Sequence, residues 1–481
     1  MIIFEINTWP WLNQLSHKKD HPITLENIPK IIFDKYFDLY DTIWLMGVWK
    51  RSQKSKFIAS THRGLLSDYK HALSDFSIDD VIGSPYAIYE YNVDPNLGGN
   101  IGLKIFYKEL KSRNKNLILD FVPNHLSRDN PWRESHPEYF IQGSEVDSQI
   151  NPTMFFKTKN KIFAHGKDPY FPAWTDTLQV NPFSIEFRIQ VIETLSKIAK
   201  NCDGVRCDMA MLLTNSVFQK TWGLYAGKPL KKEFWVEVIS EIKKKYPDFL
   251  FIAEVYWDME WELIHQGFDF CYDKRLYDRL LHRPIGEIKG HLQAELKYQN
   301  HLVRFIENHD EERAITSFGL DKSLAAAMIT LTLPGCSLVH YGQDLGLSIK
   351  LPVQLGRYPP EPPNKEIQKI YADFIKVLTR NIFSNANWNF VETNNPLIFY
   401  YWKDQSTYFL VICNYSVYTL EEIINLNDIL GETMTAEKNL VETIFSRKYN
   451  NRKEENFILK EQKINLKLNP WEFLILKIIN K

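Results

Sequence analysis

Eight short apolar runs, separated by segments with helical spacing, constrain the fold of this 481-residue chain more than any other feature of its sequence. Each run has the length and the largely apolar composition of a parallel strand that is buried on both faces. Eight alternating strand and helix units predict a (β/α)8 TIM barrel. The runs are Ile2–Ile6, Thr42–Met46, Leu117–Val122, Gly204–Cys207, Phe249–Ala253, Phe268–Cys271, Val303–Glu307 and Ser337–Tyr341.

The spacing of these runs predicts an insertion after the third strand. One strand-helix-strand step takes roughly 30 residues or more, whereas Asp120 and Asp208, at the ends of the third and fourth runs, are 88 positions apart (208 − 120). Residues 126–180 are rich in Pro, Asp and aromatic residues, and we expect them to form an irregular subdomain B over one mouth of the barrel. The long step before the third run, Gly47–Asn100, is expected to be an extended loop on the same face.

The pattern changes to period two after about residue 385, where polar clusters separate the apolar runs Leu397–Trp402, Tyr408–Asn414 and Phe473–Ile479. Alternation of this kind predicts a C-terminal antiparallel β-sandwich. The expected domains are therefore a barrel (1–125 and 181–384), an inserted subdomain B (126–180) and a C-terminal β-sandwich (385–481).

The fourth run, Gly204–Cys207, leads into a charged pair. Arg206 and Asp208 are two positions apart, so their side chains would share one face of a strand. A neighbouring guanidinium lowers the pKa of a carboxyl, and an ionised carboxylate at a strand end can act as a nucleophile. An ordinary ion pair would give the same local pattern, and the pentapeptide alone leaves both interpretations open.

The charge balance of the chain bears on its partners. A net charge of −1, from 58 basic and 59 acidic residues, argues against a nucleic acid or an anionic membrane surface. The aromatic share of 14% suits a neutral carbohydrate substrate, although most rings are expected in the core.

Three sequence features predict a cytoplasmic location. The five cysteines are an odd number without a CxxC pair, which favours reduced thiols. The chain opens on a strand-like run without a basic leader segment, and we find no apolar stretch of about 18 residues that could span a membrane.

Polar clusters follow four of the predicted strands, and the carboxyl ends of barrel strands share one active site. The clusters are Asp120-Phe-Val-Pro-Asn-His125, Gly204-Val-Arg-Cys-Asp208, Ala253-Glu254-Val255 and Glu307-Asn-His-Asp310. In order and spacing, these motifs resemble the four signature regions of the α-amylase family (glycoside hydrolase family 13), which comprises retaining α-glycosidases and transglycosylases. That family combines a barrel, an inserted subdomain B and a C-terminal β-sandwich, so the resemblance covers essentially the whole chain.

The resemblance implies three catalytic residues: Asp208 as nucleophile, Glu254 as general acid/base and Asp310 as transition-state stabiliser. Retention requires one ionised carboxylate and one proton-bearing carboxyl roughly 5–5.5 Å apart. Arg206 would keep the nucleophile charged, and the apolar neighbours of Glu254 are compatible with its partial desolvation.

The resemblance also implies a substrate-binding set. His125 and His309 match histidines that bind the sugar in the first glycone subsite, and Tyr86 resembles the stacking platform of the family. Together with Arg206, these residues are the expected substrate-binding residues.

Two positions depart from the pattern of calcium-dependent α-amylases, which commonly carry a Lys-His pair where this chain has Met211 and Leu212. Apolar side chains cannot donate charged hydrogen bonds to a glucan, so a typical calcium-dependent α-amylase is not expected. Asn124 is the only plausible calcium ligand, and calcium prefers six or more oxygen ligands. We therefore expect no required cofactor and no metal site.

The sequence predicts a retaining α-glycosidase that acts on α-glucans or short α-glucosides. The long loop and the insertion suggest a partly covered pocket, which favours short substrates or chain ends. A glucan or glucosyl transferase with the same site and a non-catalytic carbohydrate-binding relative are the alternatives. The retention of Asp208, Glu254 and Asp310 argues against the non-catalytic one.

Overall fold

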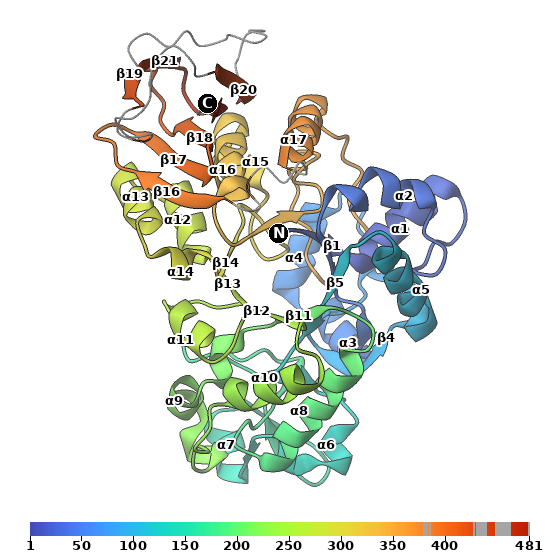
Figure 1. Cartoon of the computed structure of the whole chain (residues 1–481). Coiled ribbons are helices and arrows are strands. Elements are labelled where there is room, and N and C mark those ends of the chain that lie inside the picture. Colours follow the sequence, from blue (N-terminus) through green and yellow to red (C-terminus); the bar gives the residue numbers. More distant parts are fainter. Residues whose placement is uncertain (379–382, 384–385, 427–428, 430–439, 448–462, 480–481) are drawn as a thin grey trace. The chain divides into compact units, whose positions relative to one another are not determined.

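The computed structural model of the chain describes residues 1–378, 383, 386–426, 429, 440–447 and 463–479 (Figure 1). Eight parallel strands form a closed barrel in the order β1-β15-β14-β13-β12-β11-β5-β2, which confirms the predicted TIM barrel. The strands are β1 (Ile2–Asn7), β2 (Thr42–Met46), β5 (Asn116–Phe121), β11 (Gly204–Cys207), β12 (Leu250–Ala253), β13 (Phe270–Tyr272), β14 (Leu302–Arg304) and β15 (Cys336–His340).

The chain divides into two compact units. The first comprises Met1–Tyr272 with Ile349–Glu361, and the second comprises Asp273–Ser348 with Pro362–Lys481. The predicted domain boundaries around residues 125 and 180 stay predictions, and the boundary at 384–385 falls outside the described residues.

In the first unit, barrel strands alternate with amphipathic helices. Every residue of β2 and β11 is buried, including Arg206 of β11, as expected for barrel strands that are covered on both faces. The helix α8 begins where the Ser184 side chain caps the backbone N–H of Phe187, and its Phe187 ring stacks on Phe234 of α10. The main helices of this unit are α1 (Thr8–Lys19), α5 (Gly99–Ser112), α8 (Ile185–Ile198), α9 (Asn215–Ala226) and α10 (Phe234–Lys245).

The segment between β2 and β5 is not the extended loop that was predicted. It contains an antiparallel pair of strands, β3 (Trp49–Arg51) and β4 (Ile88–Val93), and the helices α3 (Gln53–Thr61) and α4 (Arg63–Ala72). Caps stabilise both helices, because the side chains of Ser52 and His62 accept hydrogen bonds from the first turns.

The insertion after β5 contains two small sheets, in agreement with an inserted subdomain. The strands β6 (His125–Ser127) and β10 (Thr177–Gln179) pair with each other, while β7 (Gln142–Gly143), β9 (Ile162–Ala164) and β8 (Phe155–Lys157) form a three-stranded sheet. The insertion also carries the short helices α6 (Trp132–Ser135) and α7 (Glu145–Ile150). Its apolar side chains pack with Phe218 and Trp222 of α9 into one buried cluster, so this segment shares a core with α9.

In the second unit, helices accompany the parallel strands β14 and β15. They include α12 (Lys274–His282), α13 (Ile285–Leu292), α15 (Ala314–Phe318), α16 (Leu320–Thr332) and α17 (Lys365–Leu378). The C-terminal part forms a five-stranded antiparallel sheet in the order β16-β17-β18-β22-β20 and a two-stranded sheet of β19 and β21. These strands are β16 (Asn387–Val391), β17 (Leu397–Asp404), β18 (Thr407–Asn414), β19 (Leu420–Asn425), β20 (Leu440–Arg447), β21 (Lys463–Leu468) and β22 (Phe473–Ile479).

One buried cluster joins the two C-terminal sheets. Leu410 and Leu476 from the larger sheet pack with Ile464 and Leu466 from the smaller one. A core between two sheets is the architecture of a sandwich, and it confirms the predicted C-terminal β-sandwich.

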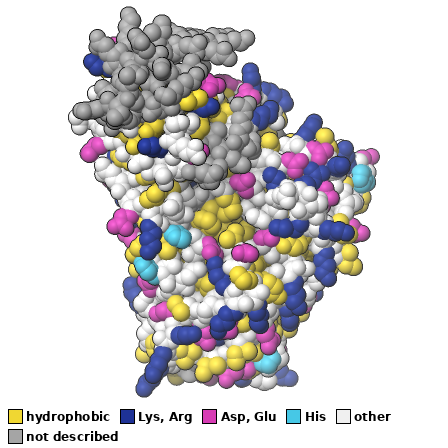
Figure 2. Space-filling model, viewed as in Figure 1, with side chains coloured by type: hydrophobic (Ala, Val, Ile, Leu, Met, Phe, Trp, Pro, Cys, Tyr) yellow, Lys and Arg dark blue, Asp and Glu magenta, His cyan; other side chains and the backbone are white. Residues whose placement is uncertain are grey.

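The described surface and cysteines agree with the expectations from composition. On the face in Figure 2, acidic and basic side chains are interspersed. The five cysteines are buried free thiols. Among the described residues, no helix has both the length and the apolarity needed to cross a membrane. The cytoplasmic location stays a prediction.

Candidate active site

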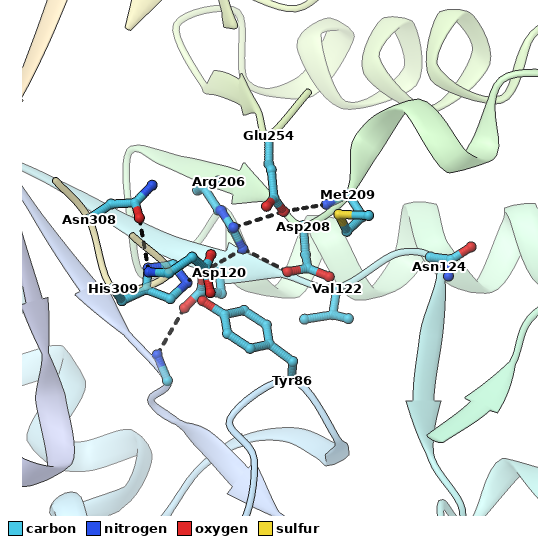
Figure 3. A network of polar contacts seen from close by, with 12 residues as sticks. Tyr86, Asp120, Val122, Asn124, Arg206, Asp208, Met209, Glu254, Asn308 and His309 are labelled. Carbon is cyan, nitrogen blue, oxygen red and sulfur yellow. Dashed lines mark hydrogen bonds and ion pairs between the residues drawn. The ribbon is translucent and has the colours of Figure 1, made fainter. Parts of the chain in front are cut away.

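The carboxyl end of β11 carries a buried ion pair. Arg206 Nη1 donates a hydrogen bond of 2.8 Å to Asp208 Oδ1, and the two residues are 1% and 6% exposed. The strand alternation inferred from the sequence therefore places both side chains on one face, as Figure 3 shows.

Glu254 reaches the same guanidinium from the neighbouring strand. It directly follows β12, whose Ala253 lies in register with Cys207 of β11. The distance from Arg206 Nη2 to Glu254 Oε2 is 2.8 Å, so one guanidinium lies between two carboxyl groups (Figure 3). The shared guanidinium fixes the positions of the two carboxyl groups relative to each other.

Two further donors hold Glu254, which is 4% exposed. The backbone N–H of Met209 donates to Oε2 at 2.7 Å, and the hydroxyl of Tyr256 donates to Oε1 at 2.8 Å. Met209 adopts a left-handed backbone conformation with φ 45°, which turns its N–H toward the neighbouring strand end.

Aromatic rings surround the shared guanidinium. Its central carbon lies 5.3 to 5.7 Å from the ring centroids of Trp44, Tyr86 and Tyr272, and Arg206 Nε donates to the Tyr272 hydroxyl at 3.3 Å. Burial alone would lower the pKa of Arg206, but the charge of Glu254 and the other acidic groups around it raises that pKa well above its ordinary value. The site therefore contains a permanent, fixed cation.

Asp120, at the end of β5, supports this arrangement. Its Oδ2 accepts a hydrogen bond from the backbone N–H of Gly47 at 2.8 Å, and its Oδ1 lies 3.6 Å from Arg206 Nη1. Trp49 Nε1 donates to the Asp120 carbonyl. These contacts connect β5 to the segment after β2 and hold the Asp120 carboxylate near the Arg206 guanidinium.

His125 and Tyr86 also belong to the first unit. His125 is buried, and its ring centroid lies 5.0 Å from that of Trp174. Burial lowers its pKa to about 3, although a hydrogen bond with the Tyr86 backbone acts in the opposite direction. Its imidazole is therefore neutral near pH 7, while Tyr86 is half-buried with its ring beside Arg206.

His309 and Asp310 lie in the second unit, in the loop after β14. His309 Nε2 is 3.0 Å from Asp310 Oδ2, and the His309 ring is buried whereas the Asp310 side chain is 43% exposed. Asn308 Oδ1 accepts hydrogen bonds from the backbone N–H groups of Asp310 and Glu311, both at 2.9 Å. This turn fixes the loop and leaves the Asp310 carboxylate accessible.

Sequence reasoning placed the expected acids, Arg206 and both histidines at or just after strand ends, and Tyr86 in the long segment before the third predicted strand, but it missed three groups that hold them. Tyr256 could have been found, because it is two positions from Glu254 and would share its face in an extended segment. Tyr272 and the Met209 backbone gave no signal, because their contacts depend on the pairing of strands.

The described residues contain no group of three or more His, Cys, Asp or Glu side chains that could hold a metal ion. Asn124 Oδ1, the candidate calcium ligand, accepts a hydrogen bond of 3.0 Å from Gln179 Nε2. A calcium ion is bound by oxygen ligands, whereas here an N–H donor faces the Asn124 oxygen. Met211 and Leu212, at the positions of the usual Lys-His pair, are both buried in the turn after Asp208.

Comparison with known proteins shows which family the chain resembles. Residues 40–266 match the sequence model of the α-amylase catalytic domain. Over this range the chain is similar to the α-amylase family. Alpha-amylase 3 of Dictyoglomus thermophilum is 26% identical over 293 residues, which are 56% of this chain and 55% of that protein. Alpha-amylase MalA of Haloarcula japonica is 25% identical over 322 residues, 61% of this chain and 42% of its own length. The chain spans about half the length of these curated relatives.

Solved structures of the α-amylase family share the fold over the full chain. A maltogenic α-amylase, AmyB, from Thermotoga neapolitana has a TM-score of 0.68 at 20% identity, with 100% of this chain and 98% of that chain covered. A debranching enzyme from Nostoc punctiforme has a TM-score of 0.68 at 17% identity, with 99% and 97% covered.

Proposed function

We propose that this chain is a retaining α-glycosidase of the α-amylase family that acts on α-glucans or short α-glucosides through a covalent glycosyl-enzyme. The observation that carries the proposal is the pair of carboxyl groups, Asp208 and Glu254, held by the guanidinium of Arg206 at the ends of adjacent strands. Two carboxyl groups in fixed positions are the minimum that retention requires.

In the first step, a carboxylate oxygen of Asp208 forms a bond to the anomeric carbon while the glycosidic bond breaks. Glu254 gives its proton to the departing oxygen. In the second step, Glu254 takes a proton from water, and the water oxygen displaces Asp208 from the anomeric carbon. Arg206 keeps Asp208 charged and oriented throughout, because the guanidinium stays protonated.

The other expected residues bind the sugar in this proposal. The Asp310 carboxylate is accessible to sugar hydroxyls, and its neighbour His309 orients it through a 3.0 Å contact. The neutral imidazole of His125 can both donate and accept a hydrogen bond, and the half-buried ring of Tyr86 offers a stacking surface.

We also propose that the enzyme needs no calcium. The hydrogen bond from Gln179 to Asn124 supports this, as does the burial of the apolar side chains at positions 211 and 212. A substrate pocket partly covered by the insertion would favour short glucosides or chain ends over the interior of a long glucan.

Rescue by azide of two variants tests the assigned roles, with an α-glucosyl fluoride as substrate because fluoride leaves without a proton donor. Asp208→Gly should lose about four orders of magnitude in kcat or more, and azide should restore turnover with a β-glycosyl azide as product. Glu254→Ala should form the glycosyl-enzyme, and azide should then release the α-glycosyl azide.

The matched control is Asp203→Asn at the opposite end of β11. Asp203 binds the Tyr107 hydroxyl and Lys111, and a change at the amino end of a barrel strand should alter stability rather than turnover. Exchange of the two azide products between the variants would contradict the assignment, and undiminished activity of Asp208→Gly would refute the mechanism. NMR of the products from maltose, maltotriose and glycogen identifies the preferred substrate and separates hydrolysis from glucosyl transfer.

A further inference from the structure

A cavity of about 480 Å³ lies outside the proposed catalytic centre, within the first unit. Its lining comes from the β3–β4 pair, α5, the turn 130–132 and α8. The side chains that define its chemistry are the aromatic residues Trp49, Tyr89 and Trp132 and the amides Asn92, Asn100 and Gln190. Its volume is in the range of small-ligand sites.

Hydrogen bonds hold the aromatic walls of this cavity in place. The buried side chain of Asn130 donates to the Tyr89 carbonyl at 2.8 Å and accepts from the Trp132 backbone N–H at 2.9 Å. One asparagine therefore connects the backbones of two ring-bearing residues that are about forty positions apart. The Trp132 ring also packs edge-to-face on Tyr139, with a centroid distance of 5.9 Å.

The amide groups at the other side are also ordered by hydrogen bonds. Asn100 Oδ1 accepts from the Val93 backbone N–H at 2.9 Å, and Asn100 Nδ2 donates to Asn92 Oδ1 at 3.0 Å. Gln190 Nε2 lies 3.3 Å from Thr194 Oγ1 on the next turn of α8. Each primary amide has two N–H donors and a carbonyl with two lone pairs, so these side chains can make further hydrogen bonds to a ligand.

The acidic side chain of the lining is already neutralised. The carboxylate of Glu90 pairs with Lys50 at 2.8 Å, and the Lys50 ammonium lies 5.0 Å from the centroid of the Tyr89 ring. The lining lysines, Lys104 and Lys197, are exposed to solvent. Flat apolar rings and ordered amides suit a neutral ligand with one apolar face and many hydroxyls, which describes a sugar ring.

We propose that this cavity is a second carbohydrate-binding site, which holds a neutral α-glucan chain at a distance from Asp208 and Glu254. The choice of a sugar rests on the aromatic and amide lining, whereas the choice of an α-glucan rests on the proposed function. The site would keep a long substrate attached between rounds of cleavage and would matter little for a substrate of two or three sugar units.

Calorimetric titration of the full chain with maltoheptaose tests the proposal, with Asp208→Asn present to prevent turnover. We expect two binding sites per chain. Adding Trp132→Ala or Tyr89→Ala should remove one site or weaken it by about tenfold, in line with the loss of one stacking ring. Gln190→Ala provides a milder change, because this side chain lies partly exposed on α8.

The control is Phe57→Ala on α3. Phe57 is 60% exposed and also has a lysine, Lys54, over its ring at 5.2 Å, but it lies outside the cavity. This variant should leave both sites intact. Unchanged titration of all three cavity variants would refute the proposal. Loss of the second site in the presence of inorganic phosphate would also refute it, because the lysines would then be binding an anion.

Kinetics separate this inference from the proposed function. In the otherwise native chain, Trp132→Ala should raise KM for glycogen several-fold and leave kcat/KM for an α-glucosyl fluoride unchanged. If the native chain is inactive but Trp132→Ala still removes a maltoheptaose site, only the enzyme assignment is refuted. An active chain with a single maltoheptaose site would refute the second site alone.

Discussion

The buried imidazole of His125 should make the protein lose stability on mild acidification. In the folded chain its pKa falls from 6.5 to about 3, so the folded state resists protonation while the unfolded state accepts a proton below pH 6.5. The stability from this group is therefore fully present above pH 6.5 and is lost as the pH falls toward 3. At pH 5 the unfolded-state pKa lies 1.5 units above the solution pH. Protonation of the unfolded state should therefore lower the free energy of unfolding by about 2 kcal/mol.

Urea unfolding at pH 7.5 and pH 5.0 measures this contribution. We expect the pH-dependent loss of unfolding free energy to be about 2 kcal/mol smaller in His125→Gln than in the native chain, because glutamine does not titrate. His165, whose pKa is lowered to about 4 mainly by burial, should give a similar reduction in His165→Gln. The two reductions should add.

A buried residue that does not titrate provides the control. Gln179→Ala removes hydrogen bonds to Asn124 and should lower stability equally at both pH values. The same pH-dependent loss in His125→Gln and in the native chain would refute the reasoning, since it would mean that the imidazole is protonated to the same extent in the folded and unfolded states.

Four further predictions concern the barrel and its site. Arg206→Met should lower the free energy of unfolding by about 3–5 kcal/mol, because it leaves two buried carboxyl groups without their shared cation. Arg206→Lys keeps a positive charge but cannot bind Asp208 and Glu254 at the same time, so kcat should fall about 10²–10³-fold. Wild-type turnover in this variant would contradict the role of the guanidinium that the two acids share. Gly204→Ala should cost about 1–3 kcal/mol in thermal unfolding, since a Cβ would lie 2.6 Å from the Leu250 carbonyl oxygen. Dialysis against EDTA should leave activity unchanged, and activity lost to the chelator and restored by calcium alone would show a required metal.

The strands of the barrel were predictable because a strand that is buried on both faces is made mostly of apolar residues, and such runs are visible in the sequence. Thr42–Met46 and Gly204–Cys207 have the bounds in the structure that the sequence predicts. The ion pair between Arg206 and Asp208 followed from the period of a strand alone. These features depend on neighbours along the chain, which a single sequence displays.

Features that depend on strand pairing or on weak helical patterns were not predictable. The contact between Arg206 and Glu254 requires the register of β11 against β12, which no local pattern specifies. The helix α4 carries glycine and polar residues among its apolar ones, so the sequence pattern predicted a loop in this segment. The cavity beside β4 and α8 combines residues about a hundred positions apart, and its lining has no common motif in the sequence.

The contact between Met209 and Glu254 has a consequence for protein engineering. The donor is a backbone N–H, so any residue except proline at position 209 can supply the same hydrogen bond to the acid/base. The side chain at this partly exposed position can thus be varied to alter substrate preference without removing a donor from Glu254. Its left-handed conformation restricts the choice, because glycine, asparagine and aspartate adopt φ 45° readily while β-branched residues do not. A variant library at position 209 should therefore be enriched in active clones that carry these three residues.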